Sequence, residues 1–245
     1  MSIFRSIVFS AVLSGLIGGA AVTVLQYFST VPLILKAETY EHQAPEAGVK
    51  PTGESTKGHA PHNHASHEHE ATAWKPAEGL QRNGLTAAAN ILTAIGFSLL
   101  LAGFYAMRGG VDRHEALLWG LSGFVVFTAA PGLGLPPELP GAPVAALGAR
   151  QLWWTMTALA TALGMGLIFL HRAVWATVLG FCLVVSPHLV GAPQHAGAHS
   201  DVPDALSHQF VVSVTITSLL FWALLGCLTG VFFHRFSARS SGASS

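Results

Sequence analysis

The chain has 245 residues, of which 51% are hydrophobic and only 10% are charged, and its mean hydropathy is +0.51. About a quarter of the residues in soluble domains are charged, so this composition excludes an ordinary soluble protein and indicates several membrane-spanning segments. Twelve Lys and Arg residues balance twelve Asp and Glu residues, so the chain lacks the basic excess typical of nucleic-acid binding, and no such partner is expected.

The first predicted element is a membrane helix within residues 1–35, because about 20 consecutive apolar residues suffice to cross a bilayer. A cleaved signal peptide is the alternative, with the small residues 19–21 as a cleavage site, but the apolar stretch continues well beyond them. Gly15 and Gly19 form a G-x-x-x-G pair, whose lack of side chains lets another helix approach closely in lipid.

Residues 36–84 are the longest polar segment and predict a mostly irregular loop, since Pro, Gly, Ser and Ala are abundant there. Short His-rich tracts typically bind divalent transition metals through neutral imidazole. The irregular spacing excludes a folded Cys₂His₂-type zinc site. A solvated linker that binds metal only adventitiously is the alternative. The candidate ligands in this tract are His59, His62, His64, His67 and His69.

A second candidate metal site lies at the start of the same segment. Glu38, Glu41 and His42 would share one face of a helix, because they are three and four residues apart. Carboxylates and an imidazole together suit a divalent ion of borderline softness. Ordinary charge at the level of the lipid headgroups explains these three residues equally well.

Two further membrane helices are predicted within residues 85–130, separated by a short charged loop. Asn90 is the strongly polar residue of the first of them. A connector rich in Pro and Gly follows at residues 131–151, with Glu138 among its prolines. Glu138 is a candidate metal ligand at the membrane surface, although a single carboxylate there is more often a structural anchor.

Residues 152–186 predict the fourth and fifth membrane helices. The fifth is short for a membrane span and is expected to end at Pro187. The fold expected is therefore all-α, a polytopic bundle of about six membrane helices, with five as the alternative count.

A second histidine-bearing loop is predicted at residues 187–209, where His188 and His195 are candidate metal ligands. The sixth membrane helix follows at residues 210–234 and contains a further G-x-x-x-G pair. A short tail at residues 235–245 completes the chain.

Basic residues concentrate on the cytoplasmic side of membrane proteins and so predict the orientation. With the N-terminus inside, half of the Lys and Arg residues fall in the short inner segments: Arg5, Arg108, Arg113, Arg172, Arg235 and Arg239. Both termini are therefore expected to be cytoplasmic. The two histidine-bearing loops and the connector would be periplasmic.

Motifs of enzymes and of nucleotide binding are absent from the sequence. It contains no G-x-x-x-x-G-K-[ST], no G-x-G-x-x-G and no H-E-x-x-H, and it lacks the local context of a nucleophile elbow. Cys182 and Cys227 lie in apolar stretches without a C-x-x-C motif and are expected to be packing residues. We therefore expect neither an enzyme nor a bound cofactor, and uphill transport would need an ion gradient or another subunit.

Several stretches together resemble the CbtA family of predicted cobalt transporter subunits, and the resemblance covers nearly the whole chain. They are V-P-L-I-L-K-A-E-T-Y-E at 31–41, W-x-P at 74–76, P-G-L-G-L-P-P-E-L-P-G-A at 131–142, R-Q-L-W-W at 150–154, S-P-H-L-V-G-A-P at 186–193 and Phe221-Trp222. The resemblance implies a multi-pass protein of the bacterial inner membrane that takes up cobalt for vitamin B12 synthesis. It also implies a small single-span partner with a His-rich end, CbtB, and a family often described with five spans.

Two functions from different classes agree with these features. In the first, outer histidines and carboxylates gather Co²⁺ and pass it between the membrane helices. In the second, the chain is a metal-binding membrane scaffold or chaperone that supports a partner transporter without conducting. Nickel or zinc is an alternative metal in either case, because ligand type does not separate these ions. Besides its partner subunit, membrane lipid is the expected surrounding of the chain.

Overall fold

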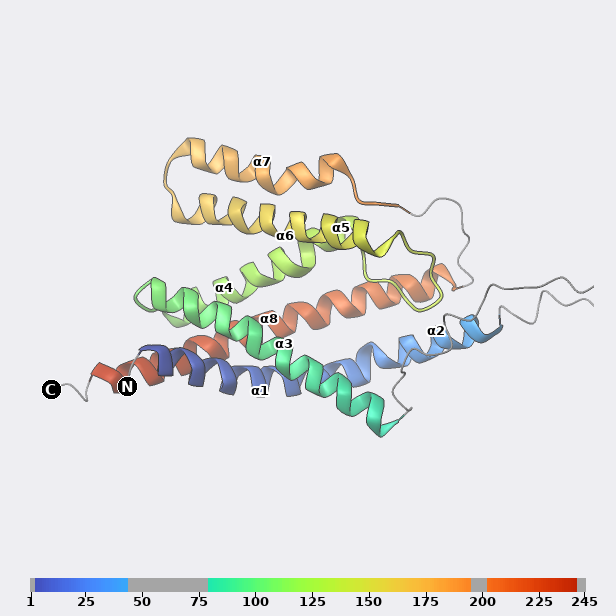
Figure 1. Cartoon of the computed structure of the whole chain (residues 1–245), viewed down its shortest axis with the longest axis horizontal. Coiled ribbons are helices and arrows are strands. Elements are labelled where there is room, and N and C mark those ends of the chain that lie inside the picture. The colour runs from blue at the N-terminus through green and yellow to red at the C-terminus, as the bar shows by residue number, and fades with distance from the viewer. Residues whose placement is uncertain (1–2, 44–78, 195–201, 242–245) are drawn as a thin grey trace, which may run out of the picture.

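The computed structural model describes residues 3–43, 79–194 and 202–241, and in this part of the chain the secondary structure is helical, with no strand (Figure 1). The elements are α1 (Ile3–Ser29), α2 (Val31–Gln43), α3 (Leu80–Met107), α4 (Arg113–Phe124), a π-helical turn η2 (Val125–Ala129), α5 (Ala130–Gly134), α6 (Leu147–Leu170), α7 (Val174–Val190) and α8 (Asp204–Ser241). The predicted all-α membrane bundle is thus confirmed.

Five helices of the described chain are long and apolar enough to cross a membrane. They are α1, α3, the continuous unit α4–η2–α5 (Arg113–Gly134), α6 and α8. The shorter apolar helix α7 has 17 residues and packs antiparallel to α6 (Figure 1). The described chain therefore has five helices of spanning length, which agrees with the alternative count of five, and the short fifth span predicted before Pro187 is the shorter apolar helix α7.

Pro187 does not end α7, contrary to the prediction, because the helix continues to Val190. A proline inside a helix leaves the carbonyl four residues earlier without its N–H donor. Here the Ser186 hydroxyl donates to the carbonyl oxygen of Leu183 at 3.0 Å and replaces that donor. The helix can therefore pass through the proline with this carbonyl still satisfied.

Two helices extend further than the sequence predicted. The predicted loop begins at residue 36, but α2 continues to Gln43, and α8 begins at Asp204, before the predicted start at 210. The cause is a buried apolar cluster in which Ala37 of α2 packs with Leu139 of the connector and with the first turns of α8. Packing of an apolar face supplies most of the stability of short helices in proteins.

The predicted close approach of small residues is confirmed in the contact between α1 and α3. A Cβ atom at Gly15 would lie 2.5 Å from the Cα atom of Ile95, and one at Gly19 would lie 2.5 Å from the Cα atom of Ile91. The second predicted G-x-x-x-G pair, on α8, also allows a close approach, here to α4: a Cβ at Gly226 would lie 2.6 Å from the carbonyl oxygen of Ala116. Glycine is therefore required for these helices to touch along their backbones.

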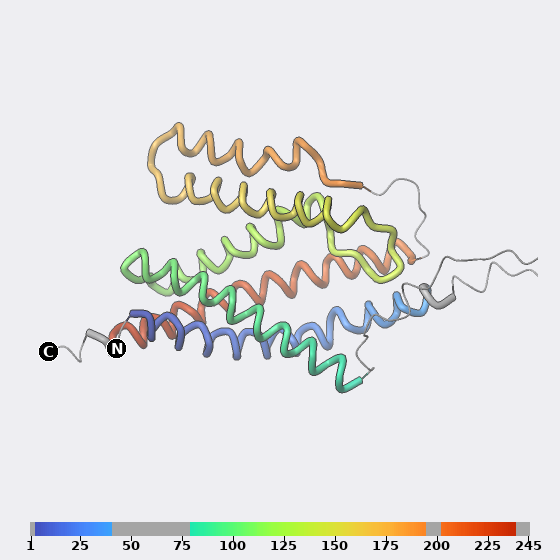
Figure 2. The backbone as a smooth tube through the Cα atoms, in the orientation of Figure 1, coloured from blue at the N-terminus to red at the C-terminus, as the bar shows by residue number. Residues whose placement is uncertain are grey.

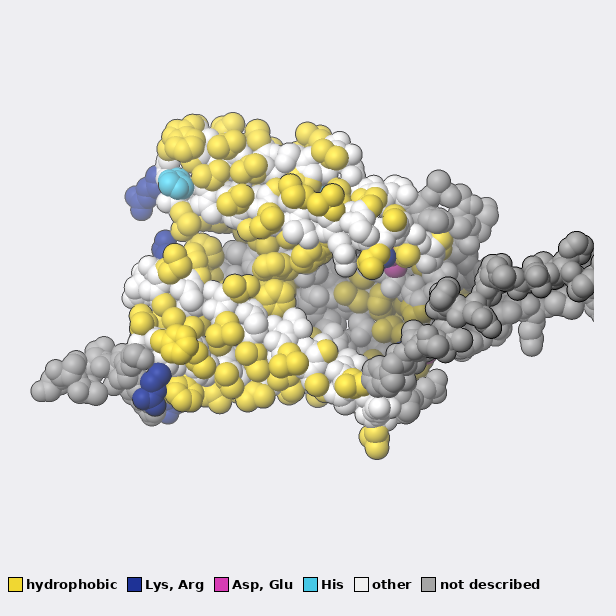
Figure 3. Space-filling model, in the orientation of Figure 1, with side chains coloured by type: hydrophobic (Ala, Val, Ile, Leu, Met, Phe, Trp, Pro, Cys, Tyr) yellow, Lys and Arg dark blue, Asp and Glu magenta, His cyan; other side chains and the backbone are white. Residues whose placement is uncertain are grey.

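The bundle has two ends of different character. The N-terminus of α1, the C-terminus of α8 and the α3–α4 and α6–α7 turns lie at one end, whereas α2, the connector and the start of α8 lie at the other (Figures 1 and 2). On the face shown in Figure 3, most Lys and Arg side chains gather at the end with the termini. We call this the basic end and the opposite end the loop end.

Candidate functional site

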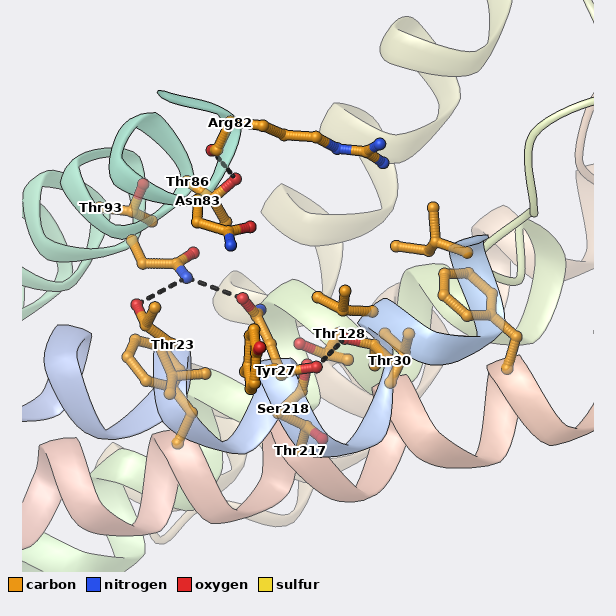
Figure 4. A pocket seen from close by; sticks show the side chains of 18 of the residues that line it. Thr23, Tyr27, Thr30, Arg82, Asn83, Thr86, Thr93, Thr128, Thr217 and Ser218 are labelled. Carbon is orange, nitrogen blue, oxygen red and sulfur yellow. Dashed lines mark hydrogen bonds between the residues drawn. The ribbon is translucent and has the colours of Figure 1, made fainter. Parts of the chain in front are cut away.

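A cavity of about 650 Å³ lies inside the bundle. It is partly open and is lined by α1, α3, η2 and α8, with one residue of α6 and the first residues of α2. Hydroxyl, amide and phenol side chains from these helices point into it (Figure 4). The lining is mainly apolar, but this many polar side chains within apolar helices is unusual, because membrane helices normally bury polar groups only where they have partners or a function.

Asn90 of α3 is at the centre of the hydrogen bonds of this cavity. Its Nδ2 donates to Thr23 Oγ1 at 3.0 Å and to Gln26 Oε1 at 2.7 Å, both on α1 (Figure 4). On the opposite side, the hydroxyls of Ser29 and Thr217 are 3.2 Å apart and link α1 to α8. The cavity is therefore held between three helices by polar contacts as well as by packing.

Aromatic rings lie at the deep part of the cavity, towards the basic end. Phe127 of η2 stacks on Trp222 of α8 with ring centroids 5.5 Å apart and an angle of 4°, and Phe97 of α3 lies 4.6 Å from the same Trp222 ring. The π-helical turn places Phe127 and Thr128 together in the lining. Such single π-turns in α-helices occur frequently at functional sites.

An ion pair lies at the loop end of the cavity. Arg82, which lines the cavity, donates from both terminal nitrogens to the carboxylate of Glu38, at 2.6 Å and 3.3 Å. Arg82 and Phe97 are fifteen residues apart on α3, so the cavity extends about 22 Å along the helix axis. The cavity thus reaches from a charged pair near one surface to an aromatic layer within the bundle.

The structure separates the other predicted ligands that it describes. Glu138 accepts from Arg150 at 2.8 Å, and the His188 ring packs edge-on against Trp153, with centroids 5.9 Å apart. Among the side chains that the structure describes, which do not include those of Glu41 and His42, no three His, Cys, Asp or Glu lie close enough together to hold a metal ion.

The remaining predicted ligands are not placed. Glu41 and His42 belong to helix α2, as their predicted helical spacing requires, but their side chains are outside the described residues. His195 and the tract of His59, His62, His64, His67 and His69 are also outside the described residues. Their roles as metal ligands stay predictions.

The cavity residues themselves were not predicted as a site. The available signal was their spacing. Thr23 and Gln26 on α1, with Thr30 directly after it, repeat at three and four residues, as do Thr86, Asn90 and Thr93 on α3. Such spacing places them on one face of each helix. Only Asn90 stood out in the sequence, because hydroxyl residues in membrane helices usually bond to their own backbone.

No curated protein and no solved structure shows significant similarity to the chain. A family model, described as the probable cobalt transporter subunit CbtA, matches residues 4–234. This match covers all the residues that line the cavity. The chain therefore belongs to the CbtA family, and with its apolar helices it is a multi-pass membrane protein of a transporter-subunit family.

Proposed function

We propose that this chain is the membrane subunit of an uptake transporter for a divalent transition metal, with cobalt as the first candidate. The observation that carries the proposal is a cavity with polar side chains in its lining, within an apolar helical bundle of a CbtA family member. Histidines and carboxylates at the loop end gather the ion, and the cavity receives it between the helices.

The loop end faces the periplasm in this proposal, and both termini are cytoplasmic. The basic residues at the other end of the bundle support this orientation, since positive charge concentrates on the cytoplasmic side of membranes. The membrane is then the bacterial inner membrane. The histidine tract at residues 59–69 and His195 collect metal at low concentration.

Glu38, Glu41 and His42 form the next stage, where the ion approaches the cavity. Glu38 lies within 2.6 Å of Arg82, a lining residue, so a cation that binds its carboxylate competes directly with the guanidinium at the cavity. Glu138 and His188 contribute further polar groups at the same end. The contact of Glu138 with Arg150 and that of His188 with Trp153 support a mainly structural role for these two residues.

A second candidate function is a metal-binding scaffold that supports a partner without conducting. The family description as a subunit favours a partner in either case. A small single-span, His-rich protein of the CbtB type is the partner that we propose. Nickel and zinc are the alternative metals in the same scheme, because the imidazole and carboxylate ligands suit all three metals.

Metal flux from the purified chain distinguishes the two functions. We expect Co²⁺ to enter liposomes that contain this chain and a trapped metal-sensitive dye, with or without the single-span partner. An Asn90→Leu variant, reconstituted at the same density, provides the matched control for the cavity. Absence of influx even with the partner present would exclude conduction and favour the scaffold.

A further inference from the structure

The cavity has an open side, which lies between α3 and α6. In the described chain α6 packs against α7, η2 and α5, and no comparable packing joins it to α1, α3 or α8. The space-filling view shows a hollow between α6 and α3 (Figure 3). Both helices are long and apolar enough to cross a membrane, so this open side faces lipid.

Polar groups line this open side at the depth of the hydrocarbon. Thr93 lies at the middle of α3, about 20 Å along the axis from either end. Thr128 of η2 and Ser218 of α8 line the cavity with it. Among the described residues, no hydrogen bond uses the hydroxyl of any of these three, and all three are at least partly exposed. Hydroxyls from three different helices are therefore left without partners near mid-membrane.

The amide groups beside them are only partly used. Asn90 donates its two Nδ2 hydrogens to α1, and its Oδ1 has no partner in the described chain. Gln26 accepts one of those hydrogens at Oε1, while its Nε2 donor is likewise free. Hydroxyls both donate and accept. The open side thus offers donors and acceptors together, and the one charged lining residue, Arg82, is held by Glu38.

These groups determine what covers the opening. Acyl chains have no hydrogen-bonding groups, so a lipid tail leaves each donor and acceptor unsatisfied, at a cost in free energy. Within the bilayer a polypeptide crosses as a helix, because its backbone must satisfy itself. Hydroxyl and amide side chains on such a helix can bond across the helix interface. The chemistry of the opening therefore fits a membrane helix that carries polar side chains of its own.

The volume fixes how deeply such a helix can sit. A helix about 10 Å across and 22 Å long occupies roughly 1,700 Å³, whereas the cavity measures about 650 Å³. The helix is therefore not enclosed. It lies along the opening and inserts the side chains of one face. Trp154 of α6 and Phe127 of η2 then provide apolar contact on one wall, and Thr93 provides the polar contact on the other.

A second copy of this chain does not supply the complementary surface. The outer faces of α1 and α7 are apolar at mid-span, where the exposed side chains include Leu13, Leu16, Ile17, Val178, Leu179 and Phe181. Such faces would leave the hydroxyls and amides of the opening unpaired. The matching helix therefore belongs to a different polypeptide, and the family description as a subunit agrees with a partner chain.

We propose that the opening between α3 and α6 is the docking site for the single membrane helix of the partner subunit, and that this helix carries a hydroxyl or amide side chain at mid-span. Lipid covers the opening when the chain is alone, and the partner's helix replaces it. This inference rests on the proposed function for the existence of a partner. The place of contact and its chemistry come from the opening itself.

Site-specific photo-cross-linking tests the place of contact. The photoreactive residue p-benzoylphenylalanine replaces Gly96, which is exposed, follows Thr93 by one helical turn, and would have nothing within 4 Å of an added Cβ. Leu179, on the outer face of α7, is the control position. The chain is reconstituted in liposomes with the single-span, His-rich protein of the CbtB type and illuminated. We expect a cross-link to that protein from position 96 and none from position 179.

Four variants test the chemistry, with energy transfer between the two labelled proteins in liposomes as the measure of affinity. Thr93→Val removes the hydroxyl and is expected to weaken association about threefold to tenfold. Thr93→Ser keeps the hydroxyl and should bind like wild type. Thr93→Trp fills the opening and should weaken association at least tenfold. Thr215→Val is the matched control, because Thr215 is exposed, donates to the carbonyl of Val211 and lies outside the lining.

Each outcome supports or overturns the docking site. Co-purification of the two proteins with cross-links from position 96 only to lipid or to a second copy of this chain would leave the partner standing and refute its place. Equal affinity of the Thr93→Val and Thr93→Ser variants, with circular dichroism showing both folded, would refute the polar contact. Absence of any association refutes the inference, while Co²⁺ influx in the same liposomes would still support transport.

Discussion

The contact between α1 and α3 gives a sharp prediction from one pair of substitutions, Gly15→Ala and Gly96→Ala. Both replace a helical glycine at nearly the same depth, since Gly15 faces Ile95. A Cβ at Gly15 meets the Ile95 backbone at 2.5 Å, whereas one at Gly96 meets nothing within 4 Å. The same chemical change is therefore expected to have opposite effects on the free energy of unfolding.

The magnitudes follow from these distances. Ordinary van der Waals contact begins at 3.4 Å, so α1 and α3 must separate by about 1 Å to admit the methyl group of Gly15→Ala. Overpacking of this kind costs about 1–3 kcal/mol, and the upper part of the range applies because the obstacle is backbone. Gly96→Ala removes a flexible residue from a helix and gains up to about 1 kcal/mol.

The assay is reversible unfolding of the purified chain in mixed micelles, followed by far-ultraviolet circular dichroism. The two variants are expected to differ by about 2–4 kcal/mol, with wild type between them. Equal stability of the two variants would refute the close approach of α1 and α3. A stabilised Gly15→Ala would refute it as well.

Three further predictions concern the loop end and α7. Replacing all histidines of residues 59–69 by Ala is expected to reduce uptake at low metal but not at saturating metal; complete loss at saturation would place the tract in the path itself. Glu38→Gln removes the carboxylate that Arg82 binds at the cavity and should lower uptake several-fold, whereas removing both charges restores it, which proteoliposome flux measures; a double variant no better than Glu38→Gln would contradict the electrostatic explanation. Ser186→Ala uncaps the carbonyl of Leu183 and should destabilise α7 by about 1 kcal/mol, visible as faster hydrogen exchange of its amides, and exchange at the wild-type rate would argue against this cap.

Hydropathy and small-residue spacing were enough to predict the bundle. A membrane helix can be recognised from its own sequence, because the bilayer, and not a neighbouring helix, sets its length and composition. The close helix contacts at Gly15 and Gly19 and at Gly226 could also be predicted from the sequence, since helices in lipid approach closely only where their residues are small.

The features that the sequence did not reveal depend on distant residues. Helix α2 persists to Gln43 because Ala37 packs against Leu139 and the start of α8, residues far away along the chain. Where α7 continues through Pro187, the Ser186 hydroxyl takes the place of the missing backbone donor to Leu183. The predicted ligands Glu38 and Glu138 each meet an arginine, and neither pairing has a local signature.

To predict the cavity, one would need the register of α1 against α3 as well as the identity of the lining residues. Asn90 was conspicuous in the sequence, but nothing there showed that its amide meets Thr23 and Gln26. That meeting is fixed by the glycines that bring the two helices together. The polar site is therefore a consequence of apolar packing.

The aromatic layer at Phe97 also fixes where an electric field acts on this bundle. Helix α3 has 28 residues, and only ten separate Phe97 from its last residue, Met107, about 15 Å along the axis. In the proposed orientation, water filling the cavity as far as Phe97 would carry the outside potential inward with it, so the voltage drop would be compressed into this shorter layer. For a divalent ion, about 4.6 kcal/mol per 100 mV would then fall across the rings of Phe97, Phe127 and Trp222 rather than across the whole membrane.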